Sequence, residues 1–248
     1  MKEGATWVVG HRGAMAYAPE NTRASFEKAW RLGVDAVECD VHLSRDGRPI
    51  VLHDATLDRT TSGRGPVRQK TWAELRSLDA GSWFGRAFAG EPLWRLDDLL
   101  RWAKPKKGRS GAPLRLLIEI KKSNTPRPLA DAVGALLRTH GMIRRSVVIS
   151  FDARALGRVK NQYPRVVTGF LFSEPLARLD AVMTTLRADG IFPRFSLITP
   201  ALADRARRRG WFLGTWTVNT GAEARRLRAL GVNAIASNVP DRLARWIR

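Results

Sequence analysis

Two histidines stand where apolar stretches of the chain end. His11 follows the run WVVG and precedes Arg12, and His53 ends the run IVLH. Histidine changes charge near neutral pH and can act as a general acid or base, and arginine binds anions through several N–H donors. These residue types together favour proton transfer beside an anionic group. A histidine in a satisfied structural hydrogen bond gives the same local pattern, so both interpretations stay open here.

Three acidic residues have the spacing of a metal site with oxygen ligands. Glu38 and Asp40 are two positions apart, so a strand places both on one face and Cys39 on the other. Glu119 lies near the end of the run LLIEIK, two positions before Lys121. Buried carboxylates repel one another unless a cation, a proton or basic partners offset the charge. Oxygen donors favour Mg²⁺ or Ca²⁺, whereas salt bridges to arginines are the structural alternative.

The chain carries a large excess of positive charge. Its 248 residues include 43 Lys and Arg against 23 Asp and Glu, a formal charge of +20. Such a charge suits an anionic partner, whether a phosphate ester, an acidic membrane surface or nucleic acid. The densest basic segments, Arg205–Arg209 and Arg225–Arg228, fall on amphipathic stretches without an aromatic platform. We therefore expect solvated helix faces and no specific nucleic-acid site.

The sequence shows no transmembrane or leader pattern. No stretch approaches the roughly 18 apolar residues needed to span a membrane, and the start MKEGATWVVG has an acidic residue where a signal peptide is basic. The single cysteine, Cys39, excludes an internal disulfide and a cysteine-based metal site and fits a reducing compartment. We expect a cytoplasmic protein, whose oligomeric state does not follow from the sequence.

Short β-rich stretches alternate with amphipathic helical ones along the whole chain. The candidate strands are Trp7–Gly10, Ala36–Leu43, Leu114–Ile120, Ser146–Ser150, Val166–Leu171, Gly190–Phe192, Phe212–Val218 and Ala234–Ala236. Several helical stretches stop at a glycine suited to a left-handed cap, as at Gly210. Eight βα units in about 250 residues predict an α/β protein with a closed (β/α)8 TIM barrel, forming one domain over residues 1–248.

One region interrupts this alternation. Residues 54–95 are rich in Gly, Thr, Arg and Trp and exceed an ordinary connection of about 2–6 residues, which predicts an insertion over one mouth of the barrel. Catalytic residues of such barrels gather at the carboxyl ends of the strands. The barrel prediction therefore brings the histidines, the carboxylates and Lys121 to one mouth.

The motifs together resemble a known family. The segments HRG, PENT, ECDVHLSRDGRPIVLHDATLDRTT, LDAGSWF and IEIKK are similar to those of glycerophosphodiester phosphodiesterases, most densely between His11 and Phe84. The resemblance covers nearly the whole chain. It implies a metal-dependent barrel with an insertion after the second histidine, which cleaves a small glycerophosphodiester to glycerol 3-phosphate and an alcohol. It also implies that the nucleophile is the substrate's own glycerol hydroxyl.

The resemblance further implies a role for individual residues. His11 and His53 would be the acid and base, Arg12 and Lys121 would contact the phosphate, Phe151 and Trp216 would border the substrate, and Glu38, Asp40 and Glu119 would bind Mg²⁺ or Ca²⁺. Two rival functions remain. The same site could cleave lysophospholipids, with the aromatic insertion accepting an acyl chain, or the basic chain could be a catalytically inactive binding protein. Peripheral contact with lipid stays open.

The last βα loop departs from the family pattern. Ser237-Asn238 stand before Pro240 where the family usually carries Thr-Asp, which leaves the role of this loop open. We interpret His42 as structural because it lies beyond the likely end of its strand. Glu20 and Asn21 are expected to brace the first loop and to orient His11, with helix capping as the alternative.

Overall fold

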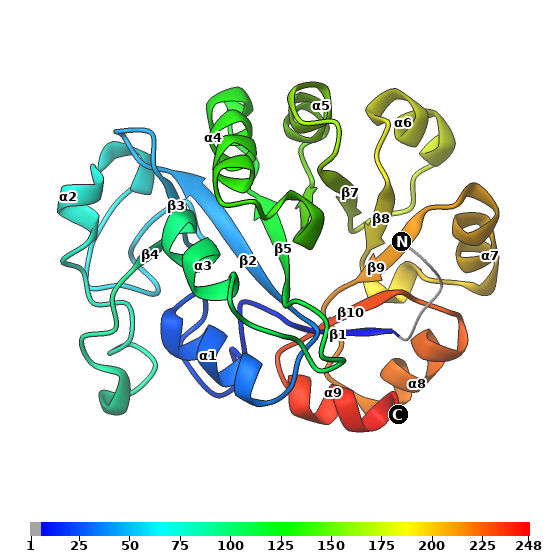
Figure 1. Cartoon of the computed structure of the whole chain (residues 1–248), viewed down its shortest axis with the longest axis horizontal. Helices are drawn as coiled ribbons and strands as arrows, with labels where there is room; N and C mark the ends of the chain where they lie inside the picture. Colours follow the sequence, from blue (N-terminus) through cyan, green and yellow to red (C-terminus); the bar gives the residue numbers. More distant parts are fainter. Residues whose placement is uncertain (1–5) are drawn as a thin grey trace.

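Eight parallel strands close into a ring in the computed structural model, which describes residues 6–248 (Figure 1). The strands are β1 (Trp7–Gly10), β2 (Ala36–Leu43), β5 (Arg115–Ile120), β6 (Ser146–Ser150), β7 (Val167–Phe172), β8 (Gly190–Pro193), β9 (Phe212–Thr215) and β10 (Ala234–Ser237). Their order is β1-β10-β9-β8-β7-β6-β5-β2, and pairing of β1 with β2 completes the ring. The (β/α)8 prediction is confirmed. The expectation of no signal peptide falls in part on residues 1–5, which lie outside the described residues.

Helices surround this ring. They are α1 (Arg23–Arg31), α3 (Leu96–Ala103), α4 (Pro126–Thr139), α5 (Ala153–Gln162), α6 (Leu179–Leu186), α7 (Pro200–Arg209), α8 (Gly221–Ala229) and α9 (Pro240–Trp246). Several begin at a side chain that accepts a backbone N–H, as Thr199 does for α7. The same helix ends at Gly210, whose φ of 66° is in the left-handed region. Within the described residues, no helix is long and apolar enough to cross a membrane.

The inward faces of the strands form a compact apolar interior, which includes Val9, Leu117 and Phe192. On β2 and β5 this inward face changes from apolar to acidic toward the carboxyl end of the strand. Ala36 and Leu117 are apolar, whereas Glu38, Asp40 and Glu119 follow them at alternating positions. Asp40 and Glu119 are direct neighbours in the parallel register. The strand pleat therefore carries the acidic side chains to one mouth.

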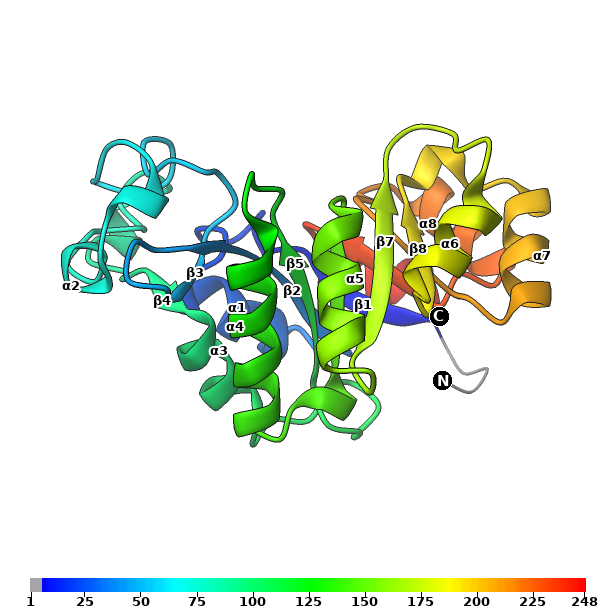
Figure 2. The same ribbon diagram turned by 90° about the horizontal axis from the view of Figure 1, so that it is seen from above.

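The insertion is attached to the outer end of β2. Strand β2 pairs antiparallel with β3 (Pro49–Val51), which pairs with β4 (Trp94–Arg95), and α2 (Trp72–Leu75) lies between them in the chain. This segment has a small core of its own, formed by Ile50, Leu52, Leu57, Val67, Leu75, Ala80 and Leu93. It projects to one side of the ring beyond α3 (Figures 1 and 2). It thus borders the mouth instead of lying over it.

We predict that Gly214→Ala destabilises the protein. A Cβ at Gly214 would lie 2.2 Å from the ring of Phe192 inside the barrel, so overpacking should lower the free energy of unfolding by about 1–3 kcal/mol. Urea denaturation would measure the change. Gly157→Ala is the control, because it adds a Cβ in open space on α5 and should stabilise by about 0.5–1 kcal/mol. A Gly214→Ala protein as stable as wild type would contradict this account of the interior.

Candidate active site

The loop after β1 holds His11 and Arg12 in a constrained backbone. Arg12 has a φ of 51°, which is costly for a residue with a side chain. Its N–H donates to Glu38 Oε2 (2.8 Å), and its carbonyl accepts from Ser25 Oγ (2.8 Å) and from the N–H of Asn21 (3.1 Å). Gly13 follows with a φ of 87°, and a Cβ there would lie 2.3 Å from Ser25 Oγ. These contacts fix the loop directly above the end of β2.

Glu38, Asp40 and Glu119 converge at the barrel mouth. One carboxylate oxygen from each lies within 4.8 Å of the others, and Glu38 and Asp40 are buried. Burial, with Asp40 beside it, raises the pKa of Glu119 to about 7. Burial and the charges of Asp40 and Glu119 also raise the pKa of Glu38 well above its usual range. The cluster is therefore short of positive charge, which a bound cation would supply.

Two basic side chains partly neutralise the carboxylates. Lys121 Nζ lies 2.8 Å from Glu119 Oε1 and 3.3 Å from Asp40 Oδ1. Burial opposes ionisation of Asp40, yet Lys121 and Arg12 hold its pKa below the usual value. Arg12 Nε is buried 3.3 Å from Asp40 Oδ2, and within residues 6–248 it has no hydrogen-bond partner. Salt bridges to basic residues, the structural alternative, are thus part of this site.

The last loop orients His11. The Nδ1–H of His11 donates to Asn238 Oδ1 (2.7 Å) in this loop. The other ring nitrogen of His11, Nε2, lies 4.0 Å from Glu38 Oε2. Burial, with Arg12 nearby, lowers the pKa of His11 to about 4. His11 is therefore a neutral imidazole near pH 7, with its Nε2 lone pair directed toward the carboxylates.

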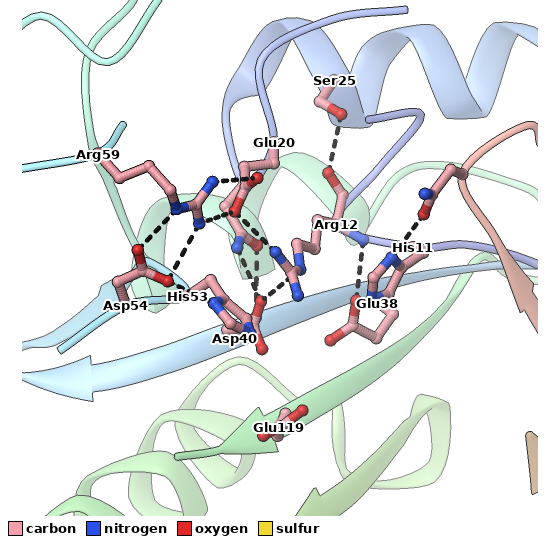
Figure 3. A network of polar contacts seen from close by, with 12 residues as sticks. His11, Arg12, Glu20, Ser25, Glu38, Asp40, His53, Asp54, Arg59 and Glu119 are labelled. Carbon is pink, nitrogen blue, oxygen red and sulfur yellow. Dashed lines mark hydrogen bonds and ion pairs between the residues drawn. The ribbon is translucent and has the colours of Figure 1, made fainter. Parts of the chain in front are cut away.

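His53 belongs to a chain of charged contacts (Figure 3). Its Nδ1–H donates to Asp54 Oδ1 (2.6 Å), and Arg59 binds both oxygens of Asp54. Arg59 also donates to both oxygens of the buried Glu20 (2.9 and 2.8 Å), which accepts from Arg12 Nη1 at 2.9 Å. One continuous network therefore joins the two histidine-bearing loops.

Three expectations about supporting residues have different outcomes. His42 lies within β2 and not beyond its end as expected, but it is buried and its Nε2–H donates to the carbonyl of His53 (3.0 Å), which agrees with a structural role. Glu20 and Asn21 do brace the first loop, because Glu20 accepts from Arg12 Nη1 (2.9 Å) and the Asn21 N–H donates to the Arg12 carbonyl (3.1 Å). The expectation that they orient His11 is wrong, because His11 is bound by Asn238 instead. The capping alternative is also wrong, since Thr22 is the cap of α1.

Phe151 and Trp216 lie apart from these polar contacts and touch each other. They directly follow β6 and β9, and their rings meet edge to face with centroids 5.5 Å apart. The indole N–H of Trp216 donates to the carbonyl of Phe192 (3.0 Å), which fixes one ring. Because parallel strands end at the same mouth, this pair forms an apolar wall on the site's side of the barrel.

Comparison with known proteins identifies the family. The glycerophosphoryl diester phosphodiesterase family profile matches residues 11–242. The chain belongs to this family. Members of this family are phosphoric diester hydrolases, and so is this protein. The chain is similar to a glycerophosphodiester phosphodiesterase of Caldanaerobacter subterraneus (32% identity, 98% of each chain) and to one of Bacillus subtilis (31% identity, 94% of this chain and 83% of the relative).

Solved structures of the same family have the same fold. The chain is similar to a glycerophosphodiester phosphodiesterase of Agrobacterium tumefaciens, with a TM-score of 0.82 and 31% identity over 97% of this chain and 99% of that one. It is also similar to a phosphodiesterase of Oleispira antarctica, with a TM-score of 0.86 and 28% identity over 96% and 95%. The latter structure contains the product sn-glycerol-3-phosphate.

Three residues that support the site of this phosphodiesterase, Asp54, Arg59 and Asn238, were not predicted from the sequence. Asp54 follows His53 directly, so its adjacency was a usable signal. Arg59 lies in the motif LDRTT but had no spacing that linked it to Glu20. Asn238 stands out in the sequence only as a departure from the family pattern, and its contact with His11 joins opposite ends of the chain. The last loop therefore contributes to the candidate site.

We predict that divalent-cation stabilisation grows with pH. The pKa of Glu119 is raised to about 7, so at lower pH a proton competes with the cation for this carboxylate. The rise in melting temperature on adding Mg²⁺ or Ca²⁺ should be larger at about pH 8 than at about pH 5.5. Differential scanning fluorimetry would measure it. The control Asp204→Asn, on the exposed face of α7, should keep the effect; equal shifts at both pH values would refute it.

Proposed function

We propose that the protein hydrolyses glycerophosphodiesters to glycerol 3-phosphate and an alcohol. The observation that carries this proposal is the convergence of Glu38, Asp40 and Glu119 within 4.8 Å beside His11 and Arg12. Such a mouth suits an anionic diester that needs charge neutralisation and proton transfer. Membership of the family and the glycerol-3-phosphate bound to the Oleispira antarctica relative support the same substrate class.

The three carboxylates fit a divalent cation. They offer only oxygen ligands at a mutual distance compatible with one ion, as Mg²⁺ and Ca²⁺ require. The raised pKa values of Glu38 and Glu119 indicate an unmet demand for positive charge. When bound, the cation would neutralise charge that develops on the phosphate oxygens.

Arg12 and Lys121 are assigned to the phosphate. Glu20 holds Arg12 Nη1 and Asp40 lies 3.3 Å from Arg12 Nε, so the guanidinium is fixed at the mouth before a phosphate arrives. Although burial opposes its charge, Asp40 and Glu119 raise the pKa of Lys121, so it is cationic at neutral pH. Donors held in place before the substrate arrives stabilise developing negative charge without reorganisation.

His11 and His53 are assigned to proton transfer. One imidazole takes the proton from the glycerol hydroxyl as its oxygen bonds to phosphorus, and the other gives a proton to the departing alkoxide. The products of this step are a cyclic phosphate and the alcohol, and water then opens the ring with the proton transfers reversed. The amide partner of His11 and the carboxylate partner of His53 fix both rings for these transfers. Phe151 and Trp216 are assigned to the border of the substrate.

The rival functions have less support. The basic residues Arg205 and Arg209 on α7 form ion pairs with Asp180, so part of the surface charge is neutralised internally. Of the aromatic residues in the insertion, Trp94 packs on Phe26 and Trp72 on Arg95. The ring of Phe84 contacts those of Trp83 and Phe88, and of the aromatic residues named for the insertion these three remain to meet an acyl chain.

A substrate comparison tests the proposed function. Purified protein is assayed on glycerophosphocholine and lysophosphatidylcholine, with and without excess chelator. We expect turnover of glycerophosphocholine to exceed that of the lysolipid, to stop with chelator and to return with Mg²⁺ or Ca²⁺. Asp40→Asn should abolish it, whereas the exposed-site control Asp204→Asn should not. Full activity in chelator would sink the metal assignment, and preference for the lysolipid would favour the rival substrate.

A deoxy analogue in the same assay tests the nucleophile. Glycerophosphocholine without the hydroxyl next to the phosphoester should inhibit, and so bind, yet be cleaved far more slowly, because no neighbouring oxygen is held against phosphorus. Equal turnover of both compounds would instead indicate direct attack by water.

We predict that His11→Ala and His53→Ala each lower kcat by about 10²–10⁴-fold with little loss of thermal stability, since each removes a positioned proton-transfer group. Steady-state kinetics and melting curves would measure the two effects. His140→Ala is the control, because His140 lies between α4 and α3 and pairs with Asp97 (2.7 Å). If either variant were unfolded at the assay temperature, that histidine would be structural.

A further inference from the structure

Arg59 lies outside the barrel, in the insertion, yet four of its hydrogen bonds end at the candidate site. Its Nε and Nη2 donate to Asp54 (2.7 and 3.1 Å), and its Nη1 and Nη2 donate to Glu20 (2.9 and 2.8 Å). Such double bidentate contact uses both edges of the planar guanidinium. In Figure 3 the Arg59 guanidinium lies between the two carboxylates and contacts both.

The two carboxylates bound by Arg59 serve different halves of the site. Asp54 accepts from His53 on the loop after β3, and Glu20 accepts from Arg12 on the loop after β1. Glu20 is buried, and despite that burial Arg59 and Arg12 hold its pKa below the usual value. Arg59 thus joins, through side-chain contacts, the residue proposed for proton transfer and the residue proposed for phosphate binding.

We propose that Arg59 is a positioning residue that aligns His53 with Arg12 by binding Asp54 and Glu20 at the same time. This inference rests on the proposed function. Without Arg59, Asp54 can still meet His53 and Glu20 can still meet Arg12, but each pair is free to turn on its own loop. A lysine cannot replace it fully, because one ammonium lacks the planar fork that meets two carboxylates together.

The test compares Arg59→Ala and Arg59→Lys with wild type on glycerophosphocholine. We expect Arg59→Ala to lower kcat/KM by about 10–100-fold, the range for loss of a residue that orients a catalytic group. Both constants should change: kcat falls because His53 is misaligned, and KM rises because Arg12 is. Arg59→Lys should recover part of the loss. Guanidinium ion at millimolar concentration should partly restore Arg59→Ala and leave His53→Ala unchanged.

Arg64→Ala is the matched control, because Arg64 is an arginine of the same insertion that donates to the carbonyl of Asp58 (3.1 Å), away from the site's carboxylates. It should keep wild-type kinetics. The proposal is overturned if Arg59→Ala matches Arg64→Ala, or if its loss follows only a lower folded fraction, with unchanged kcat and KM per folded molecule and no response to guanidinium. A wild-type protein without activity on the diester would instead refute the proposed function.

Discussion

The barrel mouth buries more carboxylates than cations, and many contacts of the surrounding residues offset this excess of negative charge. Glu20, Glu38 and Asp40 are buried and Glu119 nearly so, against the largely buried cations Arg12 and Lys121. An uncompensated charge in such surroundings is strongly unfavourable. Lys121 contacts two of the carboxylates, the N–H of Arg12 contacts a third, and Arg59 reaches in from outside the ring. The negative charge that remains is charge that a bound cation would neutralise, and that cation would in turn attract an anionic ester.

The backbone accepts distortion to meet the same need. Arg12 and Asn21 both have positive φ values, at 51° and 60°, although neither is glycine. The two residues are bonded to each other and to the end of β2 through Glu38 and Asp40. Strained residues persist where their surroundings over-determine them, and they concentrate at functional sites. The carboxylates of β2 therefore hold the first loop in its conformation, and Arg12 of that loop supplies them with positive charge.

Periodic features of the molecule could be predicted from the sequence, whereas its long-range contacts could not. Alternation along β2 and β5 was enough to bring Glu38, Asp40 and Glu119 to one face, because the pleat has a fixed period. No such periodic rule predicts which residues contact His11 and Glu20. Asn238 meets His11 only because the ring closes, and Arg59 meets Glu20 only because the insertion folds back. The sideways projection of the insertion could not be predicted either. The insertion has a small core of its own, and local sequence patterns do not say where such a core lies relative to the ring.

Closure of the ring also sets when the site can exist during synthesis. Strand β1 lies between β2 and β10, and His11 takes its orientation from Asn238, which is 227 residues away in the sequence. Contacts of such sequence separation form late, because the intervening chain must be ordered first. On the ribosome, the nascent chain carries His11, His53 and the three carboxylates of the acidic cluster long before Asn238 has been added. The orientation of His11 is therefore set only when the last strand of the ring, β10, and the loop that follows it are in place.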